Sequence, residues 1–170
     1  NCLGGEESRE SYRAALNALD MAGITAHELD MIIVGTVTPD MLTPSVACLL
    51  QDKLKAYRAA AFDISAGCTG FLYALSVADS LIRAGNCSKI LVVGAETLSK
   101  ITDYTDRTTC VLFGDGAGAV VLSKEQGHHG VLSTLLYADG SCGKLLYMPG
   151  GGSAHPATTE TVKKRYHYLK

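Results

Sequence analysis

One cysteine of the chain has the surroundings of a nucleophile. Cys68 follows a short apolar run, Ala60–Ile64, and the small residues Ser65-Ala-Gly67, and a long apolar stretch typical of a helix begins with it. The first turn of a helix offers free backbone N–H groups and the positive end of the helix dipole, which favour a thiolate. The spacing therefore predicts a sulfur nucleophile on a strand–helix turn, arranged like a nucleophile elbow. From spacing alone, a purely structural cysteine at this junction remains the alternative.

The other five cysteines lack this combination of a strand end and a helix start. They are Cys2, Cys48, Cys87, Cys110 and Cys142. No two of the six cysteines form the Cys-x-x-Cys pair of a zinc ribbon or a redox motif, and we predict no metal site. A chain of this size and apolar content does not need disulfides as staples, so we expect reduced thiols that are mostly buried.

A glycine-rich run, Phe113-Gly-Asp-Gly-Ala-Gly118, invites a nucleotide-binding interpretation. Its glycines precede an apolar run that is typical of a strand, Ala117–Ser123. The dinucleotide fingerprint has the opposite order, because its glycines connect a strand to the helix that follows. We therefore exclude a Rossmann-type site and expect these glycines to allow close backbone packing or a bulge.

The elements that must position Cys68 alternate between helices and strands. The predicted helices are Glu6–Ala22, a helix capped by Thr43 with Pro44 in its first turn, and Cys68–Ala84. The predicted strands are Met31–Val37, Ala60–Ile64 and Lys89–Ala95. This order is typical of an α/β protein with a parallel sheet and helices on both faces.

Two further features refine this expectation. The helix that follows Cys68 is apolar around nearly its whole circumference, which predicts a helix buried on all sides. Ala117–Ser123 and Val131–Tyr137 read as two strands joined by a turn around Glu125-Gln-Gly127. That spacing suits a hairpin, so we expect a mixed, mostly parallel sheet.

The composition excludes several classes of protein. The 170 residues carry 15 Lys and Arg against 17 Asp and Glu, a net charge of −2, which leaves no large basic field to bind nucleic acid. The longest apolar runs have the length of strands and cannot span a membrane. Glu6 and Glu7 stand where a signal peptide would have a basic region. We therefore expect a cytoplasmic protein without nucleic-acid or membrane partners.

Four motifs occur here in the order that they have in β-ketoacyl-acyl carrier protein (ACP) synthase III, which the chain resembles from about Glu6 to Pro149. The motifs are Ser65-Ala-Gly-Cys-Thr-Gly-Phe71, Val92-Val-Gly-Ala-Glu96, Asp106-Arg107 and Phe113-Gly-Asp-Gly-Ala-Gly118. The resemblance implies a thiolase-like fold built from two similar halves. Residues 1–149 would be the N-terminal half without its first strand, and residues 150–170 a glycine-rich break that begins the connection to an absent C-terminal half.

The resemblance also implies an acyltransferase of fatty acid biosynthesis. Cys68 would take an acyl group from acyl-CoA, and malonyl-ACP would then lose carbon dioxide and attack the thioester to give 3-oxoacyl-ACP. These are substrates, and no cofactor is implied. Arg107 matches an arginine near the CoA nucleotide, and Thr43, Leu98 and Phe113 match positions of the acyl pocket. Thr43 would reach across the interface of a homodimer.

The chain departs from the family in what it lacks. A histidine and an asparagine of the family's C-terminal half donate hydrogen bonds to the malonyl thioester, and no residue here matches them. We therefore expect this chain to hold a nucleophile without completing the condensation. The alternatives are another thiolase-fold condensing enzyme, of the hydroxymethylglutaryl-CoA or polyketide synthase type, and a non-catalytic dimerising or acyl-carrier-binding module.

Overall fold

The computed structural model describes residues 4–127 and 130–170, so Cys2 lies outside the described residues. The chain divides into two compact units. The first combines the residues up to Glu96 with Gly116–Leu136, and the second combines Thr97–Asp115 with Tyr137–Lys170. No helix within the described ranges has the length and apolar content needed to cross a membrane.

A four-stranded sheet organises the first unit, in the order β2-β1-β3-β4. The strands are β1 (Met31–Gly35), β2 (Ala60–Ile64), β3 (Lys89–Thr97) and β4 (Asp115–Ser123). β1 pairs in parallel with both β2 and β3. The N–H of Lys124, just after β4, donates to the carbonyl of Ser88, just before β3, so β4 runs antiparallel to β3. The mixed, mostly parallel sheet is as predicted.

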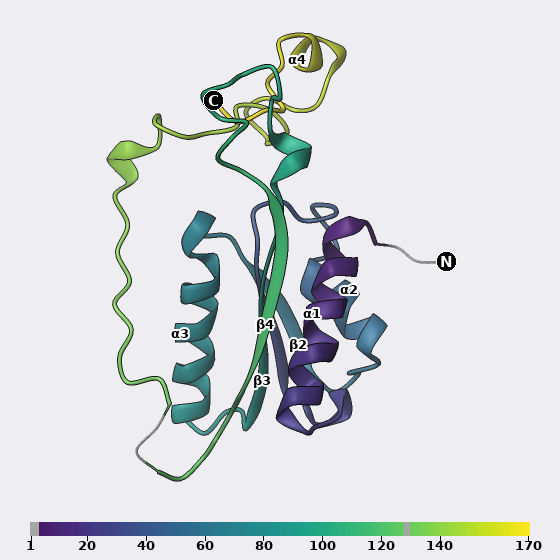
Figure 1. Cartoon of the computed structure of the whole chain (residues 1–170), viewed down its shortest axis with the longest axis vertical. Coiled ribbons are helices and arrows are strands. Elements are labelled where there is room, and N and C mark those ends of the chain that lie inside the picture. Colours follow the sequence, from purple (N-terminus) through teal and green to yellow (C-terminus); the bar gives the residue numbers. More distant parts are fainter. Residues whose placement is uncertain (1–3, 128–129) are drawn as a thin grey trace. The chain divides into compact units, whose positions relative to one another are not determined.

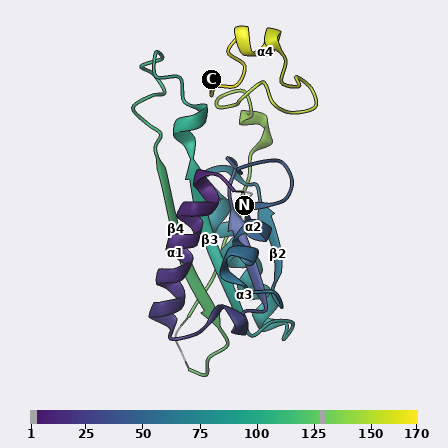
Figure 2. The same ribbon diagram turned by 90° about the vertical axis from the view of Figure 1, so that its right-hand side faces the viewer.

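Two helices cover one face of this sheet (Figures 1 and 2). α1 (Glu6–Ala22) has the predicted bounds and ends at Gly23, whose φ of 64° is left-handed. α2 (Val46–Leu54) begins later than predicted, because the hydroxyl of Ser45, and not Thr43, accepts the N–H of Cys48 and caps it. The buried residues of the two helices pack on Ile32 and Val34 of β1.

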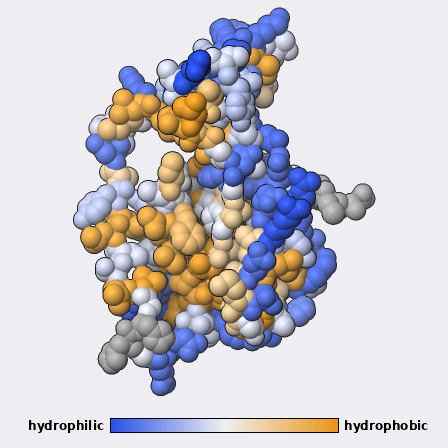
Figure 3. All heavy atoms as spheres, in the orientation of Figure 1, coloured by the Kyte–Doolittle hydropathy of each residue, from blue (hydrophilic) through white to orange (hydrophobic). Residues whose placement is uncertain are grey.

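α3 (Gly70–Arg83) lies on the opposite face of the sheet, and a short 3₁₀ turn, Gly67–Thr69, leads into it. The prediction of helices on both faces is therefore confirmed. The side chains of α3 that are buried against the sheet are Ala74, Ala78 and Ile82. The expectation that α3 is buried on all sides is wrong for this chain, since Leu72 on its outer side is 54% exposed. Apolar side chains accordingly gather over α3, whereas the outward face of α1 is polar (Figure 3).

The predicted hairpin does not form. Residues 131–136 carry no strand and run alongside α3 instead of returning next to β4 (Figure 1). Two contacts hold them there: the guanidinium of Arg83 donates to the carbonyl oxygen of Val131 at 2.7 Å, and the hydroxyls of Ser76 and Thr134 lie 3.0 Å apart. The spacing of the two runs suited a hairpin but did not identify the neighbour of residues 131–136.

The second unit contains less regular structure. It includes 3₁₀ turns at Leu98–Ile101 and Gly140–Cys142 and a short helix, α4 (Thr159–Lys163). An ion pair between Arg165 and the buried carboxylate of Asp103 joins its two segments. The hydroxyl and backbone N–H of Thr105 also donate to Asp103 and, with Arg165, hold the pKa of this carboxyl below its usual range.

Candidate functional site

Cys68 lies in the 3₁₀ turn between the end of β2 and the start of α3, and its side chain is exposed. The helix begins at Gly70, two residues later than predicted, but the turn runs into it without a break. Thr69 N–H donates to Ala66 O at 3.3 Å, and Gly70 N–H donates to Gly67 O. Cys68 therefore lies in the first helical turn of this segment, at the positive end of the α3 dipole.

A small pocket of about 180 Å³ opens beside Cys68. Its lining residues are Gly35, Gly67, Cys68, Phe71, Gly94, Ala95, Glu96 and Gly116. Gly35 is the last residue of β1, and Gly94 is its partner on β3. β1, β2 and β3 are parallel, so their carboxyl ends meet at one edge of the sheet, which is where open α/β sheets bind ligands. The Cys68 sulfur and the pocket thus share the position that this architecture favours for ligand binding.

Glycine at position 35 allows the start of α3 to approach β1 closely. A Cβ on Gly35 would lie 2.6 Å from the carbonyl carbon of Gly70 and 2.8 Å from the N of Phe71. The aromatic side chain of Phe71 also packs against Gly94, where a Cβ would come within 3.1 Å of it. These glycines set the distance between the sheet and the helix and so fix the position of Cys68. Neither glycine was predicted as a site residue from the sequence, although both end or interrupt apolar strand runs.

Glu96 places a carboxyl group at the edge of the same pocket. Its Oε1 accepts the backbone N–H of Val37 at 3.0 Å, and its Oε2 lies 2.6 Å from the hydroxyl of Thr38. These bonds tie the loop that follows β1 to the end of β3. Glu96 belongs to a motif noted in the sequence, but no role was predicted for it there.

Thr43 lies in the same unit, on the loop between β1 and α2, and is exposed. The carboxylate of Asp63 on β2 accepts the N–H groups of Val46 and Ala47, both at 2.8 Å, and so anchors the end of this loop. Burial raises the pKa of Asp63, while the two N–H bonds act in the opposite direction. The loop that carries Thr43 is therefore fixed to the strand that leads to Cys68.

The other three predicted site residues belong to the second unit. Leu98 begins the 3₁₀ turn Leu98–Ile101, Arg107 is exposed, and Phe113 is half-buried. Next to Arg107, the carboxylate of Asp106 accepts the hydroxyl and the N–H of Thr108, which holds the pKa of Asp106 below its usual range. The roles of Arg107 toward CoA and of Leu98 and Phe113 toward the acyl chain remain predictions.

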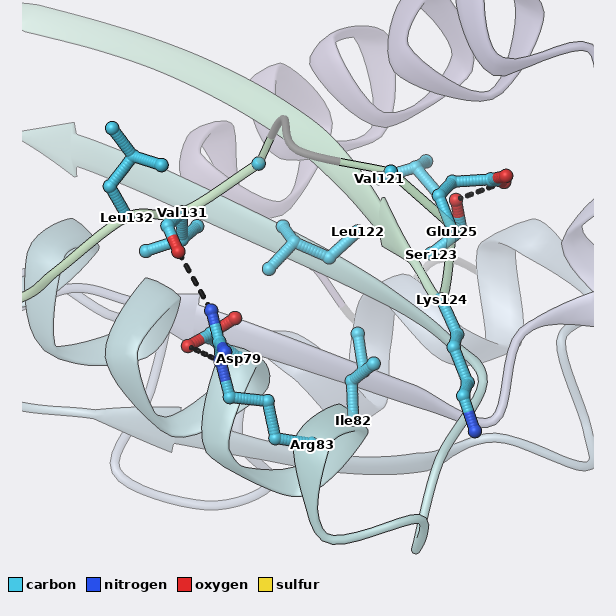
Figure 4. A pocket seen from close by; sticks show the side chains of 12 residues that line it. Asp79, Ile82, Arg83, Val121, Leu122, Ser123, Lys124, Glu125, Val131 and Leu132 are labelled. Carbon is cyan, nitrogen blue, oxygen red and sulfur yellow. Dashed lines mark hydrogen bonds and ion pairs between the residues drawn. The ribbon is translucent and has the colours of Figure 1, made fainter.

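A larger hollow of about 720 Å³ lies in the first unit between the C-terminal part of α3 and the end of β4 (Figure 4). Ile82, Val121 and Leu122 form part of its wall, and the guanidinium of Arg83 bonds to both Asp79 and Val131 O. No cysteine or histidine occurs among the described residues that line it. Among the described residues, the cysteine nucleophile predicted from the sequence therefore lines the smaller pocket and not this hollow.

A cysteine on a helical turn at the carboxyl ends of parallel strands, in a mixed sheet with helices on both faces, is typical of thiolase-like condensing enzymes. Residues 62–140 match the family model of 3-oxoacyl-[ACP] synthase III. A β-ketoacyl-[ACP] synthase III from Syntrophomonas wolfei is 57% identical over 159 residues, which are 94% of this chain and 48% of that protein. One from Xanthomonas campestris is 58% identical over 143 residues, 84% of this chain and 44% of that protein.

Solved structures agree with the sequence relatives. The 3-oxoacyl-[ACP] synthase III from Aquifex aeolicus superposes with a TM-score of 0.83 at 44% identity, covering 94% of this chain and 52% of that one. The corresponding enzyme from Thermus thermophilus has a TM-score of 0.81 at 41% identity, covering 91% and 47%. The family model and these relatives agree with the resemblance that the sequence motifs predicted: the chain is similar to the β-ketoacyl-ACP synthase III family. It spans about half the length of the curated relatives that it matches.

Proposed function

We propose that this chain is the nucleophile-bearing half of a β-ketoacyl-ACP synthase III, with Cys68 as the residue that becomes acylated. The sulfur of Cys68 would attack the thioester carbonyl of an acyl-CoA, forming the acyl-enzyme thioester as the bond from the carbonyl carbon to the CoA sulfur breaks. The observation that carries this proposal is the position of Cys68, exposed in a helical turn beside a pocket at the carboxyl ends of β1, β2 and β3.

The first turn of the helical segment suits the charges of this step. Backbone N–H groups at such a turn can donate to the oxyanion that forms when the thiolate attacks, and preorganised donors of this kind stabilise a transition state by several kcal/mol. Gly35, Gly67 and Gly94 line the pocket beside the sulfur without side chains of their own, and the acyl group would enter there.

The second half-reaction would be a decarboxylative condensation with malonyl-ACP to 3-oxoacyl-ACP. It needs donors to the malonyl thioester, and in the family these are a histidine and an asparagine that no residue of this chain matches. We therefore keep the expectation that the 170-residue chain alone accepts an acyl group but releases no 3-oxoacyl product. The exposed apolar outer side of α3, including Leu72, is consistent with a helix that has a further partner in the complete enzyme.

The remaining assignments are part of the same proposal. Arg107 would bind the CoA nucleotide, Leu98 and Phe113 would line the acyl pocket, and Thr43 would contact the acyl pocket of the second subunit in a homodimer. Acyl-CoA and acyl carrier protein would be the partners, and fatty acid biosynthesis in the cytoplasm would be the setting. The names of the relatives support the ACP-dependent reaction over a hydroxymethylglutaryl-CoA synthase.

The test is transfer of an acyl group to the protein. The chain is incubated with acetyl-CoA, digested, and mapped by mass spectrometry, with Cys68→Ala as the control. We expect one acetyl group on the peptide that contains Cys68 and none in the variant. A non-catalytic module would show no acetylation, and acetylation of another cysteine at the same rate would contradict the assignment of Cys68.

A further inference from the structure

A buried hydroxyl bridges two carboxyl groups next to the Cys68 pocket. The Oγ of Thr38 lies 2.9 Å from Oε2 of Glu7 and 2.6 Å from Oε2 of Glu96. Glu7 comes from the first turn of α1, Thr38 from the loop after β1, and Glu96 from β3. All three belong to the first unit, and Glu7 and Thr38 are 1% and 9% exposed.

The number of protons decides how these three groups can bond. A threonine hydroxyl has one hydrogen, so it can donate to only one of the two carboxyl groups. The other contact is a hydrogen bond only if that carboxyl is protonated and donates to the threonine oxygen. If both carboxyl groups were ionised, one carboxylate oxygen would face a lone pair of the Thr38 oxygen in a buried place. Such a contact costs free energy.

Of the two carboxyl groups, Glu7 has the surroundings that favour a proton. Its Oε1 is buried and has no hydrogen-bond partner among the described residues. Leaving a buried oxygen without a partner costs less free energy for a neutral carboxyl group than for a carboxylate. Burial raises the pKa of Glu7 from 4.5 to about 7, and Glu96 and Asp40 add to this, whereas hydrogen bonds from Thr36 and Thr38 act in the opposite direction. Glu96, by contrast, is half-buried and its second oxygen accepts the N–H of Val37.

The charges around Glu7 act in both directions. From the loop, the carboxylate of Asp40 accepts the N–H groups of Glu7 and Ser8, and from β3 Glu96 faces it, so both disfavour a second negative charge. From α2, the ammonium of Lys53 donates to the hydroxyl of Ser8 at 2.8 Å and, with the α1 dipole, favours ionisation. Burial is the largest of these effects, so the protonated form is held up to about neutral pH.

We propose that Glu7, Thr38 and Glu96 form a proton-sharing chain in which Glu7 donates to Thr38, Thr38 donates to Glu96, and Glu96 is thereby positioned at the Cys68 pocket. Glu7 and Thr38 are positioning residues, since they act through Glu96. A proton can pass along the chain: Thr38 gives its proton to Glu96 as it receives the proton of Glu7, and the total charge stays at −1. The proton-sharing chain follows from the contacts of Thr38 with Glu7 and Glu96. Only its effect on Cys68 rests on the proposed function.

The first measurement locates the proton. Glutamate labelled with ¹³C at the carboxyl carbon is followed by NMR as the pH is raised, in the chain and in Glu7→Gln. We expect one carboxyl resonance to titrate near pH 7, because the pKa of Glu7 is raised to about 7. This resonance should be absent from Glu7→Gln. Glu10→Gln, on the exposed side of the same helix, is the matched control and should leave that resonance unchanged. If all glutamates titrate in the ordinary range, the proposal is wrong.

The second measurement tests the connection to Cys68 through the pH profile of its alkylation. As Glu7 loses its proton, a second negative charge appears close to the pocket and disfavours the thiolate. We expect Glu7→Gln to react as fast as the parent chain in mildly acidic solution and several-fold faster in mildly alkaline solution. Thr38→Ser should keep the parent profile, whereas Thr38→Val, which removes the hydroxyl bridge, should change it.

The outcomes separate the two proposals. Identical profiles in the folded parent, Glu7→Gln and Thr38→Val proteins would overturn the positioning role, even if Cys68 accepts an acyl group. Conversely, if Glu7 titrates as expected but Cys68 takes up no acyl group from acetyl-CoA, the proposed function is wrong. The proposal that Glu7, Thr38 and Glu96 share protons would then still stand. Circular dichroism of each variant establishes that the profiles compare folded proteins.

Discussion

Replacing Gly35 with alanine tests how the sheet positions the nucleophile. The added Cβ would lie 2.6 Å from the carbonyl carbon of Gly70, whereas ordinary van der Waals contact begins at 3.4 Å, so β1 and α3 must separate by about 0.8 Å. The atoms that must move are backbone atoms, which a side-chain rotation cannot relieve. Overpacking of this kind typically costs about 1–3 kcal/mol of unfolding free energy.

The same displacement should impair Cys68, which precedes Gly70 by two residues in a continuous helical turn. A misplacement of about 1 Å can cost on the order of 10²-fold in rate, so we expect acylation of Cys68 to slow by at least about tenfold. Urea unfolding followed by circular dichroism gives the stability, and mass spectrometry of the Cys68 peptide gives the acylation rate.

Gly70→Ala is the matched control at the same contact. A Cβ on Gly70 would lie 3.4 Å from the Cα of Gly35, and its φ and ψ of −51° and −44° are helical. Alanine is therefore expected to fit, and in a helix it gains about 0.5–1 kcal/mol over glycine. Equal stability and equal acylation rates for Gly35→Ala and Gly70→Ala would refute the argument that this close approach sets the position of Cys68.

Three further predictions concern the surroundings of the site. Asp63→Ala should cost about 1–2 kcal/mol in urea unfolding, because two N–H groups of α2 lose their acceptor, and Asp52→Ala on the exposed side of α2 should cost less. Glu7→Gln should leave stability unchanged below pH 4.5 and increase it progressively up to about pH 7, by at most about 3 kcal/mol. Between pH 4.5 and about 7 the folded parent chain binds a proton that the unfolded chain has already lost, so the parent loses stability as the pH rises and Glu7→Gln does not. A stability difference between the two proteins that does not depend on pH would contradict this prediction. In the complete enzyme, Thr43→Phe should shift preference toward shorter acyl primers, and an unchanged chain-length profile would count against the pocket assignment.

Local sequence patterns predicted the helices and strands whose ends are defined within one short segment of the chain. α1 has its predicted bounds because its apolar stripe and Gly23 define a helix and its end within one segment. β2 likewise matches its prediction, Ala60–Ile64. Cys68 could be selected because a strand, small residues and a helix follow one another directly along the chain.

Features that depend on distant segments could not be predicted in this way. The cap of α2 is Ser45 together with Asp63 from β2, a contact across 17 residues to Val46 that no local pattern shows. Residues 131–136 lie along α3, where Arg83 and Ser76 bond to them, although their spacing from Ala117–Ser123 suits a hairpin. The chain of Glu7, Thr38 and Glu96 joins three elements, so its members are unremarkable polar residues until the fold brings them together.

The most direct test of the account is the order in which the cysteines react. The folded chain is treated briefly with a limiting amount of a small alkylating reagent near neutral pH, and peptide mass mapping measures the fraction labelled at each of the six cysteines. Cys48 and Cys142 are exposed like Cys68, so the expectation of mostly buried thiols is wrong for the described residues. The helical turn and the pocket predict that Cys68 is labelled before both. If Cys48 or Cys142 is labelled well before Cys68 while the protein remains folded, the assignment of Cys68 as the activated nucleophile is wrong.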